Sequence, residues 1–196
     1  MFKRIFDIIF SVSILIFLSP LLLVVALLIK VFQGGNIFFF QNRLGLNCSE
    51  FKIIKFTSMN EKKDRDGKLL ADNFRLTKIG SILRNTSIDE IPGFINVLKG
   101  NMSVVGPRPL PIHYKERFSD FQNRRHLVKP GITGWAQING RNSLSWEEKF
   151  KLDIWYVQNK SFFLDLKIII ITVFKVFLRE NINPNGKDSV DEFLGS

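Results

Sequence analysis

MFKRIFDIIFSVSILIFLSPLLLVVALLIK, residues 1–30, opens the chain and decides what kind of fold it can have. No charged side chain occurs from Ile8 to Ile29. A straight helix of this length, rising about 1.5 Å per residue, can cross a hydrocarbon core of about 30 Å. A cleaved signal peptide fits poorly, because the run is too long, Asp7 interrupts its basic flank and no small-residue cleavage site follows. The sequence therefore predicts a membrane segment over residues 1–33.

Two membrane arrangements fit this segment. Ser19 and Pro20 lie near its middle, where a proline removes one backbone hydrogen bond and bends a helix. Lys3 and Arg4 precede the apolar run, and Lys30 follows it. Because basic flanks stay in the cytoplasm, both ends are expected on the same side of the membrane. A re-entrant helix with its break at Ser19-Pro20 and a simple spanning helix are the alternatives at this point.

The charge of the chain indicates the kind of partner. The 196 residues suit one domain beside a membrane element, and their formal net charge is +10. Such an excess of cations indicates nucleic acid, an acidic lipid surface or a phosphorylated substrate. The 20 phenylalanines, against 2 tyrosines and 3 tryptophans, favour lipid contact over base stacking. No nucleic-acid-binding signature occurs, so membrane lipid is expected as a partner and nucleic acid is not.

The rest of the chain predicts an α+β fold that is mostly helical. We expect a catalytic domain over residues 34–182 and a polar tail over residues 183–196. Two strands, 37–40 and 51–56, read as a small β-hairpin with its turn at residues 42–45. Helices are expected at 74–85, at 90–99 with Gly100 as its C-cap, at 146–158 and at 162–178. The last helix is either an in-plane interfacial helix or a buried core helix.

An acidic pair, Asp89-Glu90, stands out in this basic chain. One interpretation is structural: Ser87 and Glu90 match a capping box, and carboxylates are favoured in a first helical turn. Pro92 weakens this interpretation, because it would be the fifth helical residue and lacks an N–H group. The pair keeps a second interpretation, which is catalysis.

Catalysis would divide the work between the two carboxylates. One can be a nucleophile toward a phosphate, and the other can hold Mg²⁺, which favours one or two carboxylates plus substrate phosphates. A carboxylate that attacks an anionic phosphate needs cations nearby. Arg84 and Arg108 are the candidates, since a guanidinium group matches phosphate oxygens and Arg108 lies in a rigid Gly-Pro-Arg-Pro turn.

At these residues the chain resembles the bacterial sugar transferases, the monotopic phosphoglycosyl transferases that act on a polyprenyl phosphate. The resemblance is closest to the small single-domain enzymes of the PglC type and covers nearly the whole chain. Its elements are KRIFD (3–7), the Ser19-Pro20 break, FFFQNRLG (38–45), SIDEIPGFINVLKGNMSVVGPRP (87–109), KPGITGWAQINGR (129–141) and LDIWYVQNKSFFLDLKI (152–168).

The resemblance implies a reaction and a place for it. Asp89 would attack the β-phosphate of a UDP-sugar, release UMP and pass the sugar phosphate to undecaprenyl phosphate. A UDP-linked N-acetylated amino sugar is the expected donor, with glucose or galactose as the fallback. The enzyme would be a monotopic protein of the bacterial inner membrane. Its re-entrant helix and interfacial amphipathic helices would hold the catalytic domain at the cytoplasmic face.

The resemblance also implies roles for individual residues. Catalysis would rest on Asp89 and Glu90, with Glu90 also a Mg²⁺ ligand and Asp153 a second acidic candidate for the metal. The phosphate-binding candidates are Lys55, Arg84, Arg108 and Arg141. The chain departs from the family near these motifs, with Thr57 in place of a basic residue, Gly93 in place of glutamine and Asn101 in place of aspartate. Asp153 can equally be a partner for Lys149 or Lys151.

Two other classes of function compete with the enzyme. A membrane-tethered basic module could bind anionic lipid or nucleic acid without catalysis, which would leave the acidic pair unexplained. A purely structural membrane scaffold would leave the Gly-Pro-Arg-Pro turn without a purpose. Release of UMP from UDP-sugars separates the enzyme from both.

Overall fold

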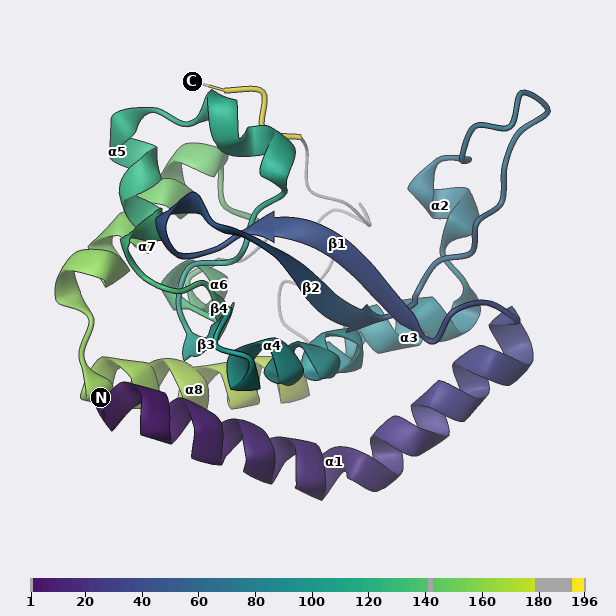
Figure 1. Cartoon of the computed structure of the whole chain (residues 1–196), viewed down its shortest axis with the longest axis horizontal. Helices are drawn as coiled ribbons and strands as arrows, with labels where there is room; N and C mark the ends of the chain where they lie inside the picture. Colours follow the sequence, from purple (N-terminus) through teal and green to yellow (C-terminus); the bar gives the residue numbers. More distant parts are fainter. Residues whose placement is uncertain (1, 141–142, 179–191, 196) are drawn as a thin grey trace.

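The computed structural model describes residues 2–140, 143–178 and 192–195, and this part of the chain is mostly helical with two small two-stranded sheets (Figure 1). Its α-helices are α1 (Phe2–Gln33), α2 (Asp72–Arg75), α3 (Lys78–Asn85), α4 (Phe94–Leu98), α5 (Asp120–Asn123), α6 (Trp135–Ile138), α7 (Trp146–Asn159) and α8 (Phe162–Leu178). Its 3-10 helices are η1 (Leu46–Cys48), η2 (Ile88–Gly93), η3 (Ile112–Arg117) and η4 (Arg124–Leu127). Its strands are β1 (Phe38–Leu44), β2 (Glu50–Phe56), β3 (Ser103–Val105) and β4 (Gly131–Thr133).

Helix α1 is long, apolar and bent. Among the described residues it is the helix that is long and apolar enough to cross a membrane. The chain stays helical through Pro20, and Figure 1 shows a bend near the middle of the helix. The Ser19 hydroxyl donates a hydrogen bond of 2.8 Å to the carbonyl of Ile16, inside the turn that the proline disturbs. The structure therefore has a bent continuous helix where the sequence predicted a helix-break-helix.

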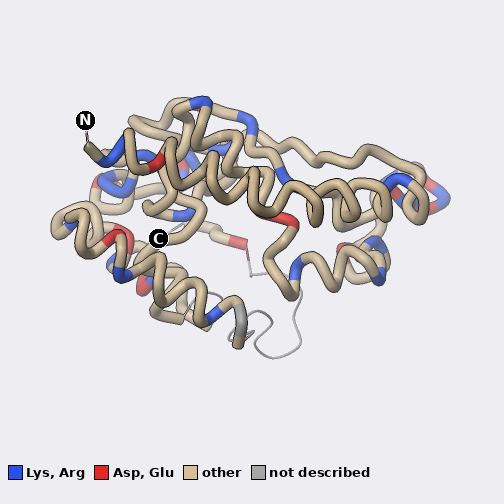
Figure 2. The backbone as a smooth tube through the Cα atoms, turned by 90° about the horizontal axis from the view of Figure 1, so that it is seen from below, with Lys and Arg blue, Asp and Glu red and all other residues tan. Residues whose placement is uncertain are grey.

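One side of the molecule is lined by apolar helices. Helices α1 and α8 run along this side, and Figure 2 shows a long stretch of α1 without charged residues. Many of their large apolar side chains are exposed, among them Phe17, Leu23, Leu27, Phe163 and Phe174. Exposed apolar surface of this extent is typical of a protein that contacts lipid or another apolar partner.

The first turns of α1 are fixed to the domain by buried polar contacts, which we call the anchor. The Asp7 carboxylate accepts hydrogen bonds from the Ser103 hydroxyl, at 2.9 and 3.1 Å, and from the backbone N–H of Val104, at 3.1 Å. Lys3 forms an ion pair with the buried carboxylate of Asp165 in α8. The anchor thus joins the start of the chain to strand β3 and to α8.

The β-hairpin forms as predicted, but its turn lies further along the chain. Strands β1 and β2 are antiparallel and pair from Phe38 with Phe56 to Leu44 with Glu50. Residues 42–44, assigned to the turn from sequence, belong to β1. The chain reverses instead at Asn47 and Cys48, whose φ angles of 50° and 57° are left-handed. Asparagine tolerates this conformation better than most residues, which makes it a suitable turn residue.

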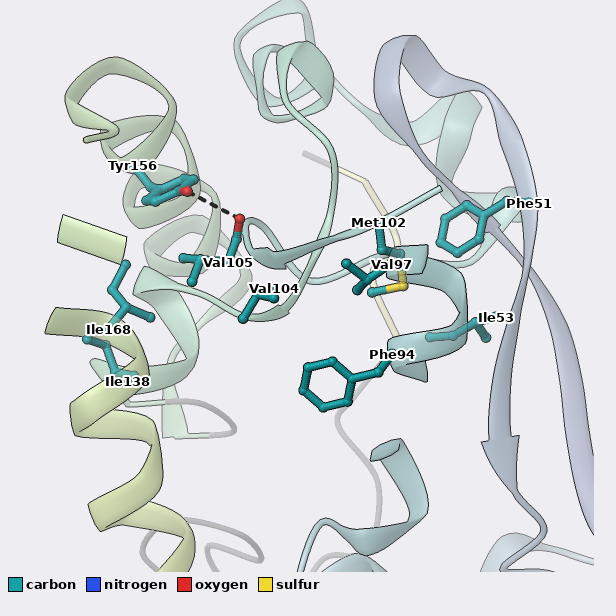
Figure 3. Close-up of a cluster of buried hydrophobic side chains, with 10 residues drawn as sticks. All are labelled: Phe51, Ile53, Phe94, Val97, Met102, Val104, Val105, Ile138, Tyr156 and Ile168. Atoms are coloured by element: carbon teal, nitrogen blue, oxygen red, sulfur yellow. Dashed lines mark hydrogen bonds between the residues drawn. The ribbon is translucent and has the colours of Figure 1, made fainter. Parts of the chain in front are cut away.

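The core lies where the second sheet meets the helices. Strands β3 and β4 are parallel, with Ser103 opposite Gly131 and Val105 opposite Thr133. Figure 3 shows the apolar cluster around β3, which draws side chains from β2, α4, α6, α7 and α8. The Tyr156 hydroxyl lies 2.7 Å from Asp165 Oδ1 and 3.2 Å from the carbonyl oxygen of Val105. The three-residue strands of this sheet were too short to be predicted from sequence.

The helices predicted from sequence are present, with differences in their bounds. The segment predicted as one helix over 74–85 is α2 and α3, separated where Thr77 accepts a hydrogen bond from the N–H of Gly80 and so caps α3. Helix α7 carries a capping box at Ser145 and Glu148. Of the predicted polar tail only residues 192–195 are described, and there Phe193 is buried in an apolar cluster.

Candidate active site

Helix η2 carries the acidic pair directly after a left-handed residue. Ser87 has a φ of 56°, an unusual angle for a residue with a side chain, and its side chain makes no capping hydrogen bond. The Glu90 side chain forms ion pairs elsewhere in the site. The predicted capping box at Ser87 is therefore wrong, because Ser87 makes no capping hydrogen bond and Glu90 pairs with cations. Pro92 falls inside this short 3-10 helix, which is followed directly by α4.

Glu90 is held by two cations. Its Oε1 lies 2.7 Å from Lys55 Nζ and 2.7 Å from Arg108 Nη2, and its Oε2 accepts a hydrogen bond of 3.3 Å from Arg108 Nη1. Burial acts to raise the pKa of Glu90, but the charges and hydrogen bonds of Arg108 and Lys55 outweigh burial and hold the pKa well below its usual range. Glu90 is therefore a permanent carboxylate at neutral pH.

Asp89 is in the opposite situation. It is only 8 % exposed, and within the described residues no side chain forms a hydrogen bond or an ion pair with its carboxylate. Burial first, and then the negative charge of Glu90, raise the pKa of Asp89 to about 6, against the lowering effect of Lys55, Arg108 and Arg84. Asp89 is thus a buried carboxylate that is ionised at neutral pH, and none of the described side chains occupies its oxygens.

Three of the predicted phosphate-binding residues surround this pair. Lys55 comes from strand β2, and burial lowers its pKa. Arg84 comes from the last turn of α3, where its Nε donates to the Ser58 hydroxyl at 3.0 Å. Arg108 keeps 45 % of its side chain exposed while it pairs with Glu90, and that carboxylate raises its pKa. The fourth candidate, Arg141, lies outside the described residues.

Arg43 in strand β1 is a further cation near the pair that the sequence did not assign to the site. It lines a small cavity of about 20 Å³ together with Lys55, Glu90 and Arg108. Burial, and then the neighbouring charge of Arg108, lower its pKa to about 10. The motif FFFQNRLG was recognised from sequence, but nothing local to it indicated that the hairpin would bring Arg43 beside residue 108.

Asp153 lies in a different setting from the one predicted. Its Oδ2 accepts hydrogen bonds from Arg125 Nε, at 3.0 Å, and from Arg125 Nη2, at 2.7 Å, and both side chains are almost fully buried. The partner is therefore Arg125 and not Lys149 or Lys151. Arg125 thus occupies one oxygen of this carboxylate, and a role of Asp153 as a metal ligand stays a prediction.

An apolar cavity of about 250 Å³ opens beside the pair. Its lining includes the charged side chains of Glu90 and Arg108. Most of its wall consists of aliphatic and aromatic side chains of the first half of α1, η2, β4 and α8, such as Ile14, Ile91 and Ile169. Gln137 also lines it, and neither atom of its buried amide has a hydrogen-bond partner. The cavity therefore combines charged groups that suit an anion with an apolar wall formed in part by α1 and α8.

The carboxylates of Asp89 and Glu90 could supply the protein ligands of a Mg²⁺ ion. Among the described residues no group of three or more His, Cys, Asp and Glu side chains could hold a metal ion. Within residues 2–140, 143–178 and 192–195, no side chain pairs with Asp89, and Glu90 Oε2 accepts only the longer hydrogen bond of 3.3 Å. One or two carboxylates completed by water and phosphate oxygens are the usual Mg²⁺ environment, so the pair fits the ion in the presence of a phosphorylated substrate.

The three departures from the family pattern lie in different surroundings. Gly93 lines the small cavity, and a Cβ there would lie 2.9 Å from the Ile132 side chain, so a larger residue needs Ile132 to move. Thr57 follows β2, where its N–H donates to the carbonyl of Ile37. Asn101 is exposed after α4. Of the three, Gly93 lies nearest to the cations that hold Glu90.

Comparison with known proteins gives a consistent result. The family model described as bacterial sugar transferase matches residues 1–179. A protein named uncharacterized sugar transferase EpsL, from Bacillus subtilis (strain 168), is 48 % identical over 99 % of this chain and 96 % of its own length.

Two relatives with named activities are longer than this chain. The UDP-glucose:undecaprenyl-phosphate glucose-1-phosphate transferase of Klebsiella pneumoniae is 44 % identical over 92 % of this chain and 41 % of its own length. The UDP-N-acetylgalactosamine-undecaprenyl-phosphate N-acetylgalactosaminephosphotransferase of Aeromonas hydrophila is 38 % identical over 87 % of this chain and 42 % of its own length. This chain therefore spans about two fifths of these two relatives.

Proposed function

The chain belongs to the bacterial sugar transferase family, and we propose that it transfers a sugar 1-phosphate from a UDP-sugar to undecaprenyl phosphate with release of UMP. The resemblance noted from the sequence is confirmed at the level of the family. Relatives named for this reaction at 38 to 44 % identity support the enzyme class. A basic module or scaffold without catalysis is correspondingly disfavoured.

One observation carries the proposal: a buried carboxylate that has no hydrogen-bond or ion-pair partner in the described part of the chain lies next to a carboxylate held by two cations. An unpartnered buried charge destabilises a fold, and such groups are concentrated at functional sites. Asp89 is ionised and its oxygens are unoccupied, as a nucleophile requires. Lys55, Arg84 and Arg108 supply the positive charge that an incoming diphosphate needs.

In the proposed mechanism, an oxygen of Asp89 attacks the β-phosphorus of the UDP-sugar. A bond forms between this oxygen and phosphorus, and the bond from phosphorus to the oxygen bridging the α-phosphate breaks. UMP leaves with that electron pair, so the sugar phosphate stays on Asp89 as an acyl phosphate. A phosphate oxygen of undecaprenyl phosphate then attacks the same phosphorus, forms the diphosphate and returns Asp89 as a carboxylate.

The residues around Asp89 have separate parts in this scheme. Lys55 and Arg108 would bind phosphate oxygens while Glu90 keeps the two cations in place between turnovers. Glu90 would hold Mg²⁺, which supplies further positive charge to the diphosphate when it is bound. Arg84 would stabilise the anion of Asp89, since its charge lowers the pKa of that group.

The large cavity suits the acceptor. Its charged end, with Glu90 and Arg108, would take the phosphate of undecaprenyl phosphate, and its apolar walls from α1 and α8 would take the first isoprene units. A lipid could then enter sideways between the two helices. In this arrangement the enzyme is monotopic, α1 is re-entrant with its bend at Ser19 and Pro20, and α8 lies in the interface on the cytoplasmic face of the inner membrane.

For the sugar of the UDP-linked donor, more than one candidate is proposed. An N-acetylated amino sugar remains our expectation, and relatives named for glucose and for N-acetylgalactosamine make both sugars necessary members of a test panel.

The test is UMP release by protein in lipid nanodiscs with Mg²⁺ and a panel of UDP-sugars. With the right donor and no undecaprenyl phosphate, we expect a burst of one UMP per enzyme and a mass increase of one sugar phosphate on the peptide that contains Asp89. Adding undecaprenyl phosphate should restore turnover and remove the adduct. These two stages separate a covalent intermediate from direct transfer.

Asp89→Asn should release no UMP, because an amide is not a nucleophile here. The matched control is Asp120→Asn, which removes an exposed carboxylate in α5 and should leave the burst unchanged. Full activity of Asp89→Asn would refute the covalent mechanism, and activity that depends on undecaprenyl phosphate without a burst would favour direct transfer.

A further inference from the structure

Three donors from distant parts of the chain hold the turn that carries Arg108. This turn, Gly106-Pro107-Arg108-Pro109, is called the Arg108 turn below. The carbonyl of Pro107 accepts a hydrogen bond from the N–H of Gly131 at 2.9 Å. The carbonyl of Arg108 accepts one from Arg125 Nη2 at 2.7 Å, and the carbonyl of Pro109 accepts one from Arg43 Nη1 at 3.1 Å.

The composition of the turn explains why its carbonyls are used. Proline has no N–H group, so a segment with proline on both sides of an arginine can be tied down mainly through its carbonyl oxygens. Three consecutive carbonyls are held from three places far apart in the sequence, which are β1, η4 and β4. The backbone that carries the Arg108 side chain is therefore fixed from several directions.

Arg125 is an unusual residue to use for this purpose. It is 3 % exposed, and its charge is balanced by Asp153, which accepts from its Nε and Nη2. Replacing a buried ion pair by apolar residues is often neutral or stabilising, so stability alone is a weak reason to keep one. The geometry of the fork gives a better reason, since Nη2 reaches Asp153 and the Arg108 carbonyl together.

On the premise of the proposed function, we infer that Arg125, anchored by Asp153, and Arg43 are positioning residues that set the Arg108 guanidinium against Glu90 and the substrate phosphate. They do not touch the reacting atoms. They act by fixing the backbone from which Arg108 reaches the site, and a displacement of even 1 Å at such a group can reduce a rate strongly.

A double-mutant cycle tests this inference. Arg125→Lys keeps the positive charge beside Asp153 but lacks the planar fork that spans both acceptors. We expect it to lower kcat/KM for UMP release about 10-fold to 100-fold in the wild-type background. In an Arg108→Ala background, where no side chain remains to be positioned, the same substitution should lower kcat/KM less than about 2-fold.

Arg117→Lys is the matched control. Arg117 also spans a carboxylate and a backbone carbonyl, those of Glu192 and Phe193, but it holds the C-terminal segment instead of the Arg108 turn. Its effect on kcat/KM should be the same factor in both backgrounds. If Arg125→Lys does not fold, Arg43→Lys takes its place in the cycle, with the same expected loss of effect on Arg108→Ala.

The possible results are distinguishable. An equal effect of the Arg125 substitution in both backgrounds, or no effect in the wild-type background, would overturn the inference while leaving the proposed function intact. Wild-type protein that releases no UMP from any donor would instead refute the proposed function. An effect confined to the background that contains Arg108 would support the inference.

Discussion

The anchor and the acidic pair both contain buried carboxylates, but they differ in whether each carboxylate has a hydrogen-bond or ion-pair partner. In the anchor, Asp7 accepts hydrogen bonds from Ser103 and Val104, and Asp165 pairs with Lys3. Asp89 and Glu90 are neighbours in the same short helix, η2. Glu90 forms ion pairs with Lys55 and Arg108, whereas no described side chain pairs with Asp89. The difference teaches that burial of an acid is no sign of function by itself. The informative feature is a buried acid whose oxygens are left without a donor.

This comparison predicts that one chemical change has opposite effects at two positions. Replacing aspartate by asparagine keeps the shape of the side chain and removes its charge. At Asp7 the change should destabilise the fold, and at Asp89 it should stabilise the fold while it abolishes activity. The predictions below take these effects in order of size.

Asp7→Asn should give the largest change in stability, a loss of about 3 to 4 kcal/mol, since hydrogen bonds to a charged acceptor contribute about 1.5 to 3 kcal/mol each. The new amide NH₂ would also face the donors of Ser103 or Val104. The unfolding midpoint of the detergent-solubilised protein, compared with wild type at pH 7.5, measures it. An unchanged midpoint would mean that the anchor does not contribute to stability.

Asp89→Asn should raise stability by up to about 3 kcal/mol at pH 7.5. The pKa of Asp89 rises from 3.8 to about 6 on folding, and 2.2 pH units correspond to that free energy. Because the pKa of Asp89 is higher in the folded than in the unfolded state, the wild-type protein becomes less stable by this amount as the pH rises from 3.8 to about 6. Unfolding midpoints measured at pH 7.5 and near pH 4 should therefore show a gain that shrinks at the lower pH. A loss of stability at both values would contradict the comparison.

Glu90→Gln should destabilise the fold by about 2 kcal/mol at pH 7.5, even though Glu90 lies beside Asp89. Its removal leaves Lys55 and Arg108 without their shared carboxylate, and a broken pair leaves charge uncompensated. The folded pKa is depressed, so wild type has this stability above the ordinary carboxyl pKa and loses it as the pH falls through the depressed value. A rise in the unfolding midpoint of Glu90→Gln, as expected for Asp89→Asn, would contradict the comparison. It would mean that the location in η2, and not the presence of an ion pair, decides whether the substitution stabilises the fold.

Local features of this fold were predictable because their causes are local. The apolar run of α1, the alternation in the hairpin and the helical spacing in α7 and α8 lie within single segments of sequence. The turn at Asn47 was misplaced because β1 continues through residues that resemble a turn in composition. A strand of three residues such as β3 leaves too short a pattern to recognise.

Partners were not predictable where they are distant in sequence. Asp7 bonds to residues about 96 positions away, and Arg125 reaches residue 108 only through the packing of η4 against α7. The resemblance supplied Asp89, Glu90, Lys55 and Arg108 as a group, yet it gave no reason why Asp153 should pair with Arg125. Contacts of this kind depend on the tertiary fold, so the residues that position the site could not be predicted from local sequence patterns, whereas the residues proposed for its chemistry could be named.

The smallest predicted effect concerns the pH dependence of the rate. If Asp89 must be ionised to attack, kcat/KM for UMP release should fall about tenfold per pH unit below a midpoint near 6, because the free enzyme then holds a protonated acid. Arg84 lowers the pKa of Asp89, so Arg84→Gln should move this midpoint to a higher pH. The measurement is kcat/KM from pH 5 to 8 for both proteins at constant ionic strength. A midpoint near 4 in wild type would mean that Asp89 has a partner in solution, and an unmoved midpoint in Arg84→Gln would place Arg84 outside the electrostatic reach of the nucleophile.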